Sequence, residues 1–315
     1  MRELERLRRL SRELIVLAFT SSRRSTQDQW ITDRMLRSLD ERHVPAGTTV
    51  YEEGELPGWL HFMADGALRM TRPGATPWTM AGRWVFGAQE ILAARPYRWT
   101  ATAEGPIDLV TVAADDWLEL VEDSFEIARE MLSSMARALT GLHERLPPDG
   151  GFGPPAVASE PPPHPPLSIL ERTLALGAVP SQRGGGMQPL VNLAESAEEV
   201  EFAPGETLFA RGALRERVFI IVDGLVELTH EEPAIRARFG PGQVAGASVA
   251  FGDAAHTWES RALEPTRALA IRIEDWAAQI EEQFDFFRSG ITALGDEREE
   301  VITQLAARSG ALVLR

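Results

Sequence analysis

The chain repeats itself, and this repeat constrains its fold more than any other feature. The first copy contains Pro45-Ala46-Gly47, Val50-Tyr51, Gly54 and Asp65-Gly66, and the second contains Ala203-Pro204-Gly205, Leu208-Phe209, Gly212 and Asp223-Gly224. The glycines of these landmarks recur 158 residues apart, and Gly87 with Gly246, Pro106 with Pro265 and Asp116-Trp117 with Asp275-Trp276 recur 159 apart. So small a drift indicates a duplication, and the 315 residues are predicted to form two similar domains.

Short strand-like segments between glycine turns fill each copy. The predicted strands are 48–52, 59–63, 67–71 and 107–112, and then 207–209, 218–222, 225–229 and 268–273. An Asp-Gly turn joins the second and third strand of each set, as in a β-hairpin. Apolar residues at helical spacing follow over 115–139 and 274–293. The predicted fold class is therefore mainly β with flanking helices (α+β), with two tandem antiparallel β-roll (jelly-roll) domains.

The repeats also predict the domain boundaries. An N-terminal amphipathic arm covers residues 1–25, the first domain 26–146 and the second domain 167–315. Proline pairs and a proline triplet crowd the segment 147–166 between them. Such density favours extended polyproline II, so this segment is predicted to be a semi-rigid linker, with a merely disordered connector as the alternative.

Composition excludes several classes of function. The formal net charge is −15 and all 32 basic residues are arginine, so the main body lacks the concentrated positive charge of a nucleic-acid binder. The chain has no cysteine, and its six histidines are scattered without ligand-like pairing, so no metal site is predicted. No apolar run is long enough to span a membrane and no secretory signal is recognised, so a cytoplasmic protein is expected.

The glycine skeleton and the segments around it resemble the cyclic nucleotide-binding domain family. In the second copy the similar segments are FAPGETLFARGALRERVFIIVDGLVEL, FGPGQVAG and RALEPTRALAIRIEDW, and in the first they are PAGTTVYEEG, ADGALRM and VFG. The resemblance implies a cyclic-phosphate cassette. In that family a Phe-Gly-Glu opening starts a short helix, the glutamate binds the ribose, and an arginine ten residues after the glycine pairs with the phosphate.

Both cassettes of this chain depart from the family pattern. In the first, Phe86-Gly87-Ala88 replaces the opening and Tyr97 falls on the arginine position, with Arg98 one residue beyond. In the second, Gly246-Ala247 follows an alanine and His256 falls on the arginine position. The resemblance makes these eight residues the candidate ligand-binding residues. Because the bidentate arginine is missing from both cassettes, cyclic nucleotide binding is not expected, and no cofactor is predicted.

Two aromatic features of the cassettes admit alternative interpretations. A protonated His256 would attract an anion at mildly acidic pH, whereas the simpler interpretation is a surface histidine in a degenerate loop. Tyr97 and Trp99 would stack on an aromatic ligand, whereas Trp258 at the equivalent place in the second copy favours packing.

The N-terminal arm carries a leucine stripe. Leu4, Leu7, Leu10, Leu14 and Leu17 recur at three- and four-residue steps, with arginines opposite. The alternatives are a helix that docks on its own domain and a short coiled-coil-like contact in a homo-oligomer. Residues 23–26, Arg-Arg-Ser-Thr, resemble the inhibitor segment of kinase regulatory subunits, although such a short basic pattern is common by chance.

These observations lead to one main hypothesis of function and one alternative. No catalytic motif is found, so the chain is not predicted to be an enzyme. The main hypothesis is a non-catalytic scaffold that contacts other proteins through exposed apolar pockets or edge strands. The alternative is a ligand-gated regulator in which the first domain binds a cyclic nucleotide or another anion through an altered cassette.

Overall fold

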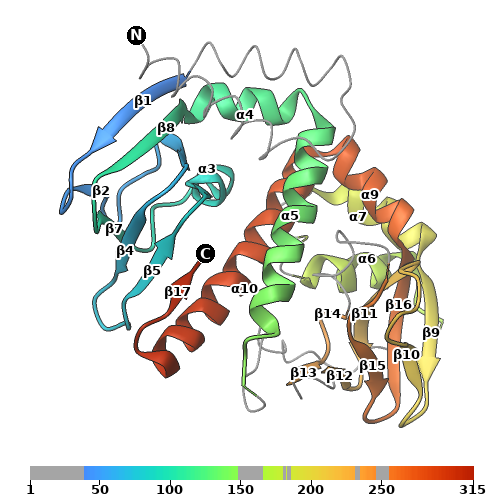
Figure 1. The fold of residues 1–315 in the computed structure, drawn as a ribbon. Helices are drawn as coiled ribbons and strands as arrows, with labels where there is room; N and C mark the ends of the chain where they lie inside the picture. Colours follow the sequence, from blue (N-terminus) through green and yellow to red (C-terminus); the bar gives the residue numbers. More distant parts are fainter. Residues whose placement is uncertain (1–38, 148–165, 180–181, 183–185, 231–234, 246–254) are drawn as a thin grey trace. The chain divides into compact units, whose positions relative to one another are not determined.

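The structure, a computed structural model, describes residues 39–147, 166–179, 182, 186–230, 235–245 and 255–315 (Figure 1). The predicted arm with its leucine stripe, nearly all of the proline-rich linker, and the candidate residues Gly246 and Ala247 lie outside these residues. The chain divides into two compact units, Met1–Met131 with Leu305–Arg315, and Leu132–Gln304. Each unit is described by itself.

The first unit is an antiparallel β-roll made of two sheets. One sheet has the order β1-β8-β3-β6, from β1 (Leu39–Val44), β8 (Ile107–Ala113), β3 (Trp59–Met63) and β6 (Trp84–Phe86). The other has the order β17-β5-β4-β7-β2, from β17 (Val313–Leu314), β5 (Trp78–Ala81), β4 (Ala67–Thr71), β7 (Thr100–Ala103) and β2 (Thr49–Tyr51). Alternate residues of β4 are buried, so the core lies between the two sheets.

The second unit repeats this arrangement. Its sheets have the orders β14-β11-β16-β9 and β10-β15-β12-β13. The strands are β9 (Glu198–Phe202), β10 (Thr207–Phe209), β11 (Arg217–Asp223), β12 (Val226–His230), β13 (Ile235–Phe239), β14 (Val244–Ala245), β15 (Glu259–Ala262) and β16 (Thr266–Arg272). The predicted β-roll fold is therefore confirmed in both copies, and β3, β4 and β10 have the predicted bounds.

The Asp-Gly turns show why the repeat keeps its glycines. Gly66 and Gly224 have φ of 111° and 93°, which side-chain-bearing residues rarely adopt. The preceding aspartates accept hydrogen bonds from their backbone N–H groups, at 2.8 Å and 3.0 Å. A Cβ on Gly224 would lie 2.5 Å from the Pro265 carbonyl oxygen, so the backbone itself leaves no room for a side chain there.

Helices follow each roll, but they are broken where the sequence pattern predicted continuous ones. The predicted helix 115–139 is divided into α4 (Ala114–Glu122) and α5 (Phe125–His143), and the predicted helix 274–293 into α9 (Ile273–Glu282) and α10 (Phe284–Ser309). At the second break Gln283 has an extended backbone, φ −133° and ψ 98°, which ends α9. The apolar spacing continues across such a break, so the pattern alone does not reveal it.

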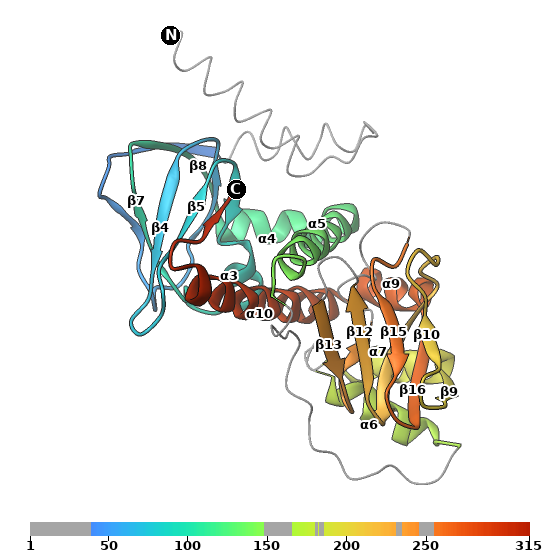
Figure 2. The same cartoon turned by 60° about the horizontal axis from the view of Figure 1, so that its bottom comes forward.

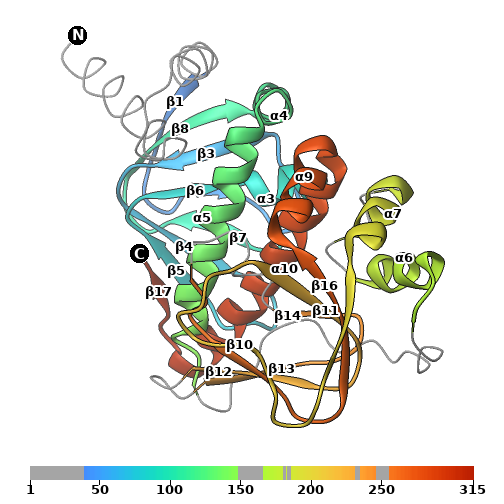
Figure 3. The same cartoon turned by 90° about the vertical axis from the view of Figure 1, so that its right-hand side faces the viewer.

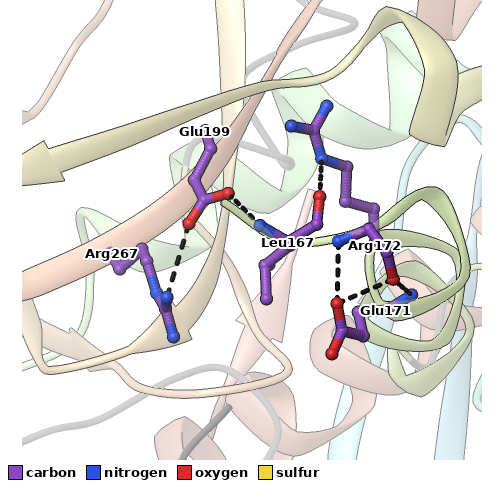
Figure 4. A network of polar contacts seen from close by, with 6 residues as sticks. Leu167, Glu171, Arg172, Glu199 and Arg267 are labelled. Carbon is purple, nitrogen blue, oxygen red and sulfur yellow. Dashed lines mark hydrogen bonds and ion pairs between the residues drawn. The ribbon is translucent and has the colours of Figure 1, made fainter. Parts of the chain in front are cut away.

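Two more helices precede the second roll, and a polar network fixes the first of them. α6 (Ile169–Ala178) and α7 (Met187–Ser196) pack together beside this roll (Figure 3). Ser168 and Glu171 form a capping box at the start of α6. Glu199 of β9 accepts hydrogen bonds from Leu167 N (2.8 Å) and Arg267 of β16 (3.4 Å), and both charged side chains are only 10% exposed (Figure 4).

The last strand lies in the first compact unit, although the predicted domain boundaries place it in the second domain. α10 ends at Ser309, and the next residue, Gly310, has φ 64° and donates its N–H to the Ala306 carbonyl at 3.0 Å. After it, β17 pairs in parallel with β5 of the first roll (Figure 2). The end of the chain, assigned by the repeat to a second domain of 167–315, thus completes a sheet of the first compact unit.

Candidate functional site

Gly87 opens the first cassette. It joins β6 to the short helix α3 (Ala88–Ala93), with φ 92° and ψ −21°. A Cβ at this position would lie 2.8 Å from the backbone oxygen of Trp59 and 3.3 Å from the hydroxyl of Tyr97. Only glycine fits here, and Tyr97 lies directly beside the turn at which the cassette helix begins.

Tyr97 is held in place by both its backbone and its ring. Its carbonyl accepts from Gly54 N and its N–H donates to the Glu55 carbonyl, each at 2.9 Å. Its side chain is 5% exposed, and its ring stacks on Tyr51 of β2 with centroids 3.8 Å apart and planes at 16°. The position that the family resemblance assigns to a phosphate-binding arginine therefore carries a buried aromatic ring.

Two further rings extend this stack. His61 of β3 stacks on Phe86 with centroids 4.8 Å apart, and Phe86 lies 5.9 Å from Tyr51. Tyr51, His61, Phe86 and Tyr97, all buried, form what we name the first aromatic cluster. The sequence analysis missed Tyr51 and His61, although position 51 and its equivalent 209 are aromatic in both copies.

The electrostatics of the first cluster favour neutral groups. Burial, and then the nearby Arg42, lower the pKa of His61 to about 4. Among the described residues, no hydrogen-bond partner reaches His61 Nδ1. Burial, helped by Glu90 and Glu55, raises the pKa of Tyr97, so its hydroxyl stays protonated. The cluster thus holds a neutral imidazole and a neutral phenol where an anion would need positive charge.

The second domain builds an equivalent cluster from different residues. The ring of His256 stacks on Phe209 of β10 with centroids 3.9 Å apart and planes at 12°. Phe219 of β11 lies 6.2 Å from Phe209, and Phe202 of β9 lies 5.8 Å from Phe219. We name Phe202, Phe209, Phe219 and His256 the second aromatic cluster.

His256 has the same backbone frame as Tyr97. Its carbonyl accepts from Gly212 N at 2.8 Å and its N–H donates to the Ala213 carbonyl at 2.9 Å. The prediction of a surface histidine was wrong, because His256 is 4% exposed and stacked. Burial, and then Arg215, lower its pKa to about 4, which favours the neutral imidazole at mildly acidic pH.

The remaining candidate residues lie around the first cluster. Ala88 is the first residue of α3 and is half-buried, and Arg98 follows Tyr97 and is also half-buried. Trp99 and Trp258 are 3% and 2% exposed, which confirms that both pack in their cores. Gln89 of α3 is a buried polar residue of the cassette that the sequence analysis missed.

Fold and site together define the class of protein. It has two tandem antiparallel β-rolls, and in each roll the cassette segment is hydrogen-bonded through its backbone to a glycine-containing loop. The family model described as "Cyclic nucleotide-binding domain" matches residues 41–124 and 199–283. The chain belongs to the cyclic nucleotide-binding domain family. Domains of this family are regulatory binding domains.

Solved structures with this fold are distant in sequence. The regulatory domain of Toxoplasma gondii PKA with cAMP is 14% identical, with a TM-score of 0.36, over 94% of this chain and 98% of that chain. The regulatory subunit of a cAMP-independent protein kinase A from Trypanosoma cruzi, bound to guanosine, is 14% identical, with a TM-score of 0.32, over 86% and 83%. The sensor domain of the transcriptional regulator DNR from Pseudomonas aeruginosa is 12% identical, with a TM-score of 0.35, over 38% and 82%. A search of curated proteins gave no match.

Metal-binding and membrane-spanning features are both absent from the part of the chain that the structure describes. No group of three or more histidine, aspartate or glutamate side chains there is placed to hold a metal ion. No helix within the same residues is both long and apolar enough to cross a membrane.

Proposed function

We propose that the protein is a non-catalytic scaffold whose two cyclic nucleotide-binding-type cassettes are closed to cyclic nucleotides, and that it acts through contacts with other proteins. One observation carries the proposal. In both domains the residue at the phosphate-arginine position is a buried ring, stacked at 3.8 Å and 3.9 Å on an aromatic residue of the second strand.

The free energies involved support closed cassettes. The missing bidentate arginine removes on the order of 1.5–3 kcal/mol of phosphate binding. Turning Tyr97 out would expose an aromatic side chain that buries about 150–250 Å², at about 25 cal/mol per Å². This adds about 4–6 kcal/mol, and every 1.4 kcal/mol weakens binding about tenfold. The first effect weakens binding about 10- to 150-fold and the second about 1,000-fold or more, so together they take a micromolar ligand beyond the millimolar range.

The alternative function is a ligand-gated regulator that uses the first domain. It is favoured by Gly87, which keeps the cassette turn, and by Arg95 and Arg98, which flank Tyr97 and are half-buried. A ligand would then select an arrangement in which the first aromatic cluster is open. The second cassette has less to support such a role, since Glu259 on β15 adds a carboxylate three residues after His256 in the sequence.

Isothermal titration calorimetry distinguishes the two functions. The purified chain is titrated with cyclic AMP, cyclic GMP and the cyclic pyrimidine nucleotides at about 1 mM. We expect neither heat of binding nor thermal shift. Micromolar binding that is lost in Arg98→Ala would contradict the closed cassettes and establish the alternative.

Restoring the family residues provides the converse test. The variant Ala88→Glu with Tyr97→Arg returns the ribose carboxylate and the phosphate arginine, and removes the ring that stacks on Tyr51. We expect this variant to gain cyclic nucleotide binding that the natural chain lacks. The matched control is Ala88→Glu with Tyr97→Phe, which keeps a ring at position 97 and is expected to stay inactive.

A further inference from the structure

β17 is joined to the first roll as an added strand. It lies parallel to β5, with Val313 opposite Thr79 and Leu314 opposite Met80, and Thr79 N donates to the Leu312 carbonyl at 2.9 Å (Figure 2). Leu312 and Leu314 are 4% and 2% exposed, whereas Val313 between them is 42% exposed. Main-chain hydrogen bonds and alternate buried side chains are the two features by which sheet edges bind extended peptides.

Among the described residues, no further strand pairs with the equivalent edge of the second roll. In β13, which corresponds to β5, Arg238 pairs in register with Glu227, as Thr79 pairs with Arg69 in the first roll. The side chains of Arg236 and Arg238 are 67% and 64% exposed, and both form ion pairs with Glu227. Exposed charges of this kind protect an open edge against pairing with other strands.

β5 carries no such protection. Its sequence, Trp78-Thr79-Met80-Ala81, has no charged residue, and Trp78, Thr79 and Met80 are all buried. The internal repeat therefore provides a comparison within one chain. The covered edge strand carries no charged residue, whereas the equivalent edge strand, with which no further strand pairs among the described residues, carries two exposed arginines.

We propose that the outer edge of β5 is a strand-docking site for a partner protein with an extended segment of the Leu-Val-Leu kind, two aliphatic side chains separated by one uncharged residue. The chain's own end, 311–315, occupies the site here and competes with the partner. Because β17 pairs with β5 over only two residues, this contact opens more readily than the interior of the roll.

The β5 edge would be one surface for the protein contacts of the proposed function, and an extended aliphatic segment would be its partner. This proposal depends on that function only for the importance of such contacts, since β5 takes no part in either aromatic cluster. The two experiments also have separate readouts. Nucleotide titration reports on the cassettes and peptide binding reports on the β5 edge, so either proposal can fail while the other stands.

The test uses the full chain and a fluorescent peptide with the sequence of residues 309–315, SGALVLR. Because the chain contains no cysteine, Thr79→Cys with Val313→Cys allows the tail to be locked in place by one disulfide and released by reduction. A second variant, Leu312→Asp with Leu314→Asp, disfavours burial of the tail. The control peptide has aspartate in place of its two leucines.

In the natural chain the tethered tail competes with the peptide for the β5 edge, at an effective concentration of roughly 1 mM. This competition should weaken peptide binding. Fluorescence anisotropy should show that the Asp variant binds the peptide at least about tenfold more tightly than the natural chain. The oxidised double-cysteine chain should not bind, and reduction should restore the weak binding of the natural chain. Equal binding by the locked and reduced chains would overturn the proposal, as would a folded Asp variant that does not bind the peptide at about 1 mM. If the Asp variant does not fold, the locked and reduced chains alone decide.

Discussion

The two aromatic clusters have the same geometry and different residues. Each has a ring from the second strand stacked on a ring at the cassette position, at 3.8 Å in the first domain and 3.9 Å in the second. Each contains one buried histidine with a pKa lowered to about 4, but His61 comes from β3 and His256 from the cassette segment. Both cassettes therefore place a flat ring in the same backbone frame, and the ring is not supplied by one particular type of side chain.

The difference between the clusters also shows what the fold requires. His61 occupies the position of Phe219, and His256 occupies the position of Tyr97. A neutral imidazole replaces a hydrocarbon or phenol ring in both cases, because it is flat and its charge is suppressed by burial. An arginine cannot replace a ring in this way, since its guanidinium stays charged and would need an anion beside it.

The largest expected difference between the two units concerns the ion pairs of Arg267 and Asp108, which occupy equivalent positions on β16 and β8 but have partners at different positions of the facing strand. In the second unit Arg267 and Glu199 are both 10% exposed, whereas in the first unit His43 and Asp108 are 68% and 58% exposed. Glu199→Ala should lower the free energy of unfolding by about 3–5 kcal/mol, because it removes the carboxylate that accepts from both the buried guanidinium of Arg267 and Leu167 N. Asp108→Ala should lower it by less than about 1 kcal/mol. Urea denaturation followed by circular dichroism measures both.

Glu201→Ala is the control for the first of these variants. Glu201 lies on the same strand β9 and is exposed, so its removal should have little effect on unfolding. If Glu199→Ala and Glu201→Ala had equal effects, the buried network of Figure 4 would not stabilise the second unit.

The sequence predicts the hairpins and the cassette positions well, but it does not predict the partner rings or β17. The repeat and the family resemblance located the hairpins and placed Tyr97 and His256 at equivalent positions, because glycine turns fix the register locally. The partner rings Tyr51 and His61 were missed, since their strands have the pattern of ordinary core strands. β17 was also missed, because two aliphatic residues after a glycine do not specify which sheet edge they will join.

The hairpin glycines provide the second prediction. A Cβ on Gly224 would lie 2.5 Å and 2.6 Å from backbone atoms of Pro265 and Thr266, whereas a Cβ on Gly66 would lie 2.4 Å from a methyl group of Ile107. Gly224→Ala should therefore destabilise the chain by about 3 kcal/mol, and Gly66→Ala by about 2 kcal/mol, because a side chain can move and a backbone cannot. Gly47→Ala, with φ 77° and open space around it, should cost about 1 kcal/mol. Thermal unfolding tests this order, and a larger effect for Gly66→Ala than for Gly224→Ala would contradict it.

The buried histidines predict how stability depends on pH. Their pKa is 6.5 in the unfolded chain and about 4 in the folded chain, so between these values the unfolded state binds the proton and the folded state does not. As the pH falls from 6.5 to about 4, each histidine should lower the free energy of unfolding by about 1.4 kcal/mol per pH unit. His61→Phe should remove the contribution of the first cluster and His256→Phe that of the second. Tyr51→Phe is the control, and an unchanged pH slope in both histidine variants would show that neither imidazole is buried neutral.

The smallest expected effect comes from the partners of Trp99 and Trp258, which occupy equivalent positions in the two copies. The guanidinium of Arg72 lies 4.5 Å from the ring centroid of Trp99, and in the second unit His230 lies 5.2 Å from Trp258 at 59°. Arg72→His makes the first unit resemble the second, and at pH 8 it should lose only the cation–π attraction, about 0.5–1 kcal/mol. Arg72→Lys keeps a positive charge and should lose less. Urea denaturation at pH 8 measures both variants, and a loss above about 2 kcal/mol for Arg72→His would mean that Arg72 stabilises more of the first roll than the face of one indole.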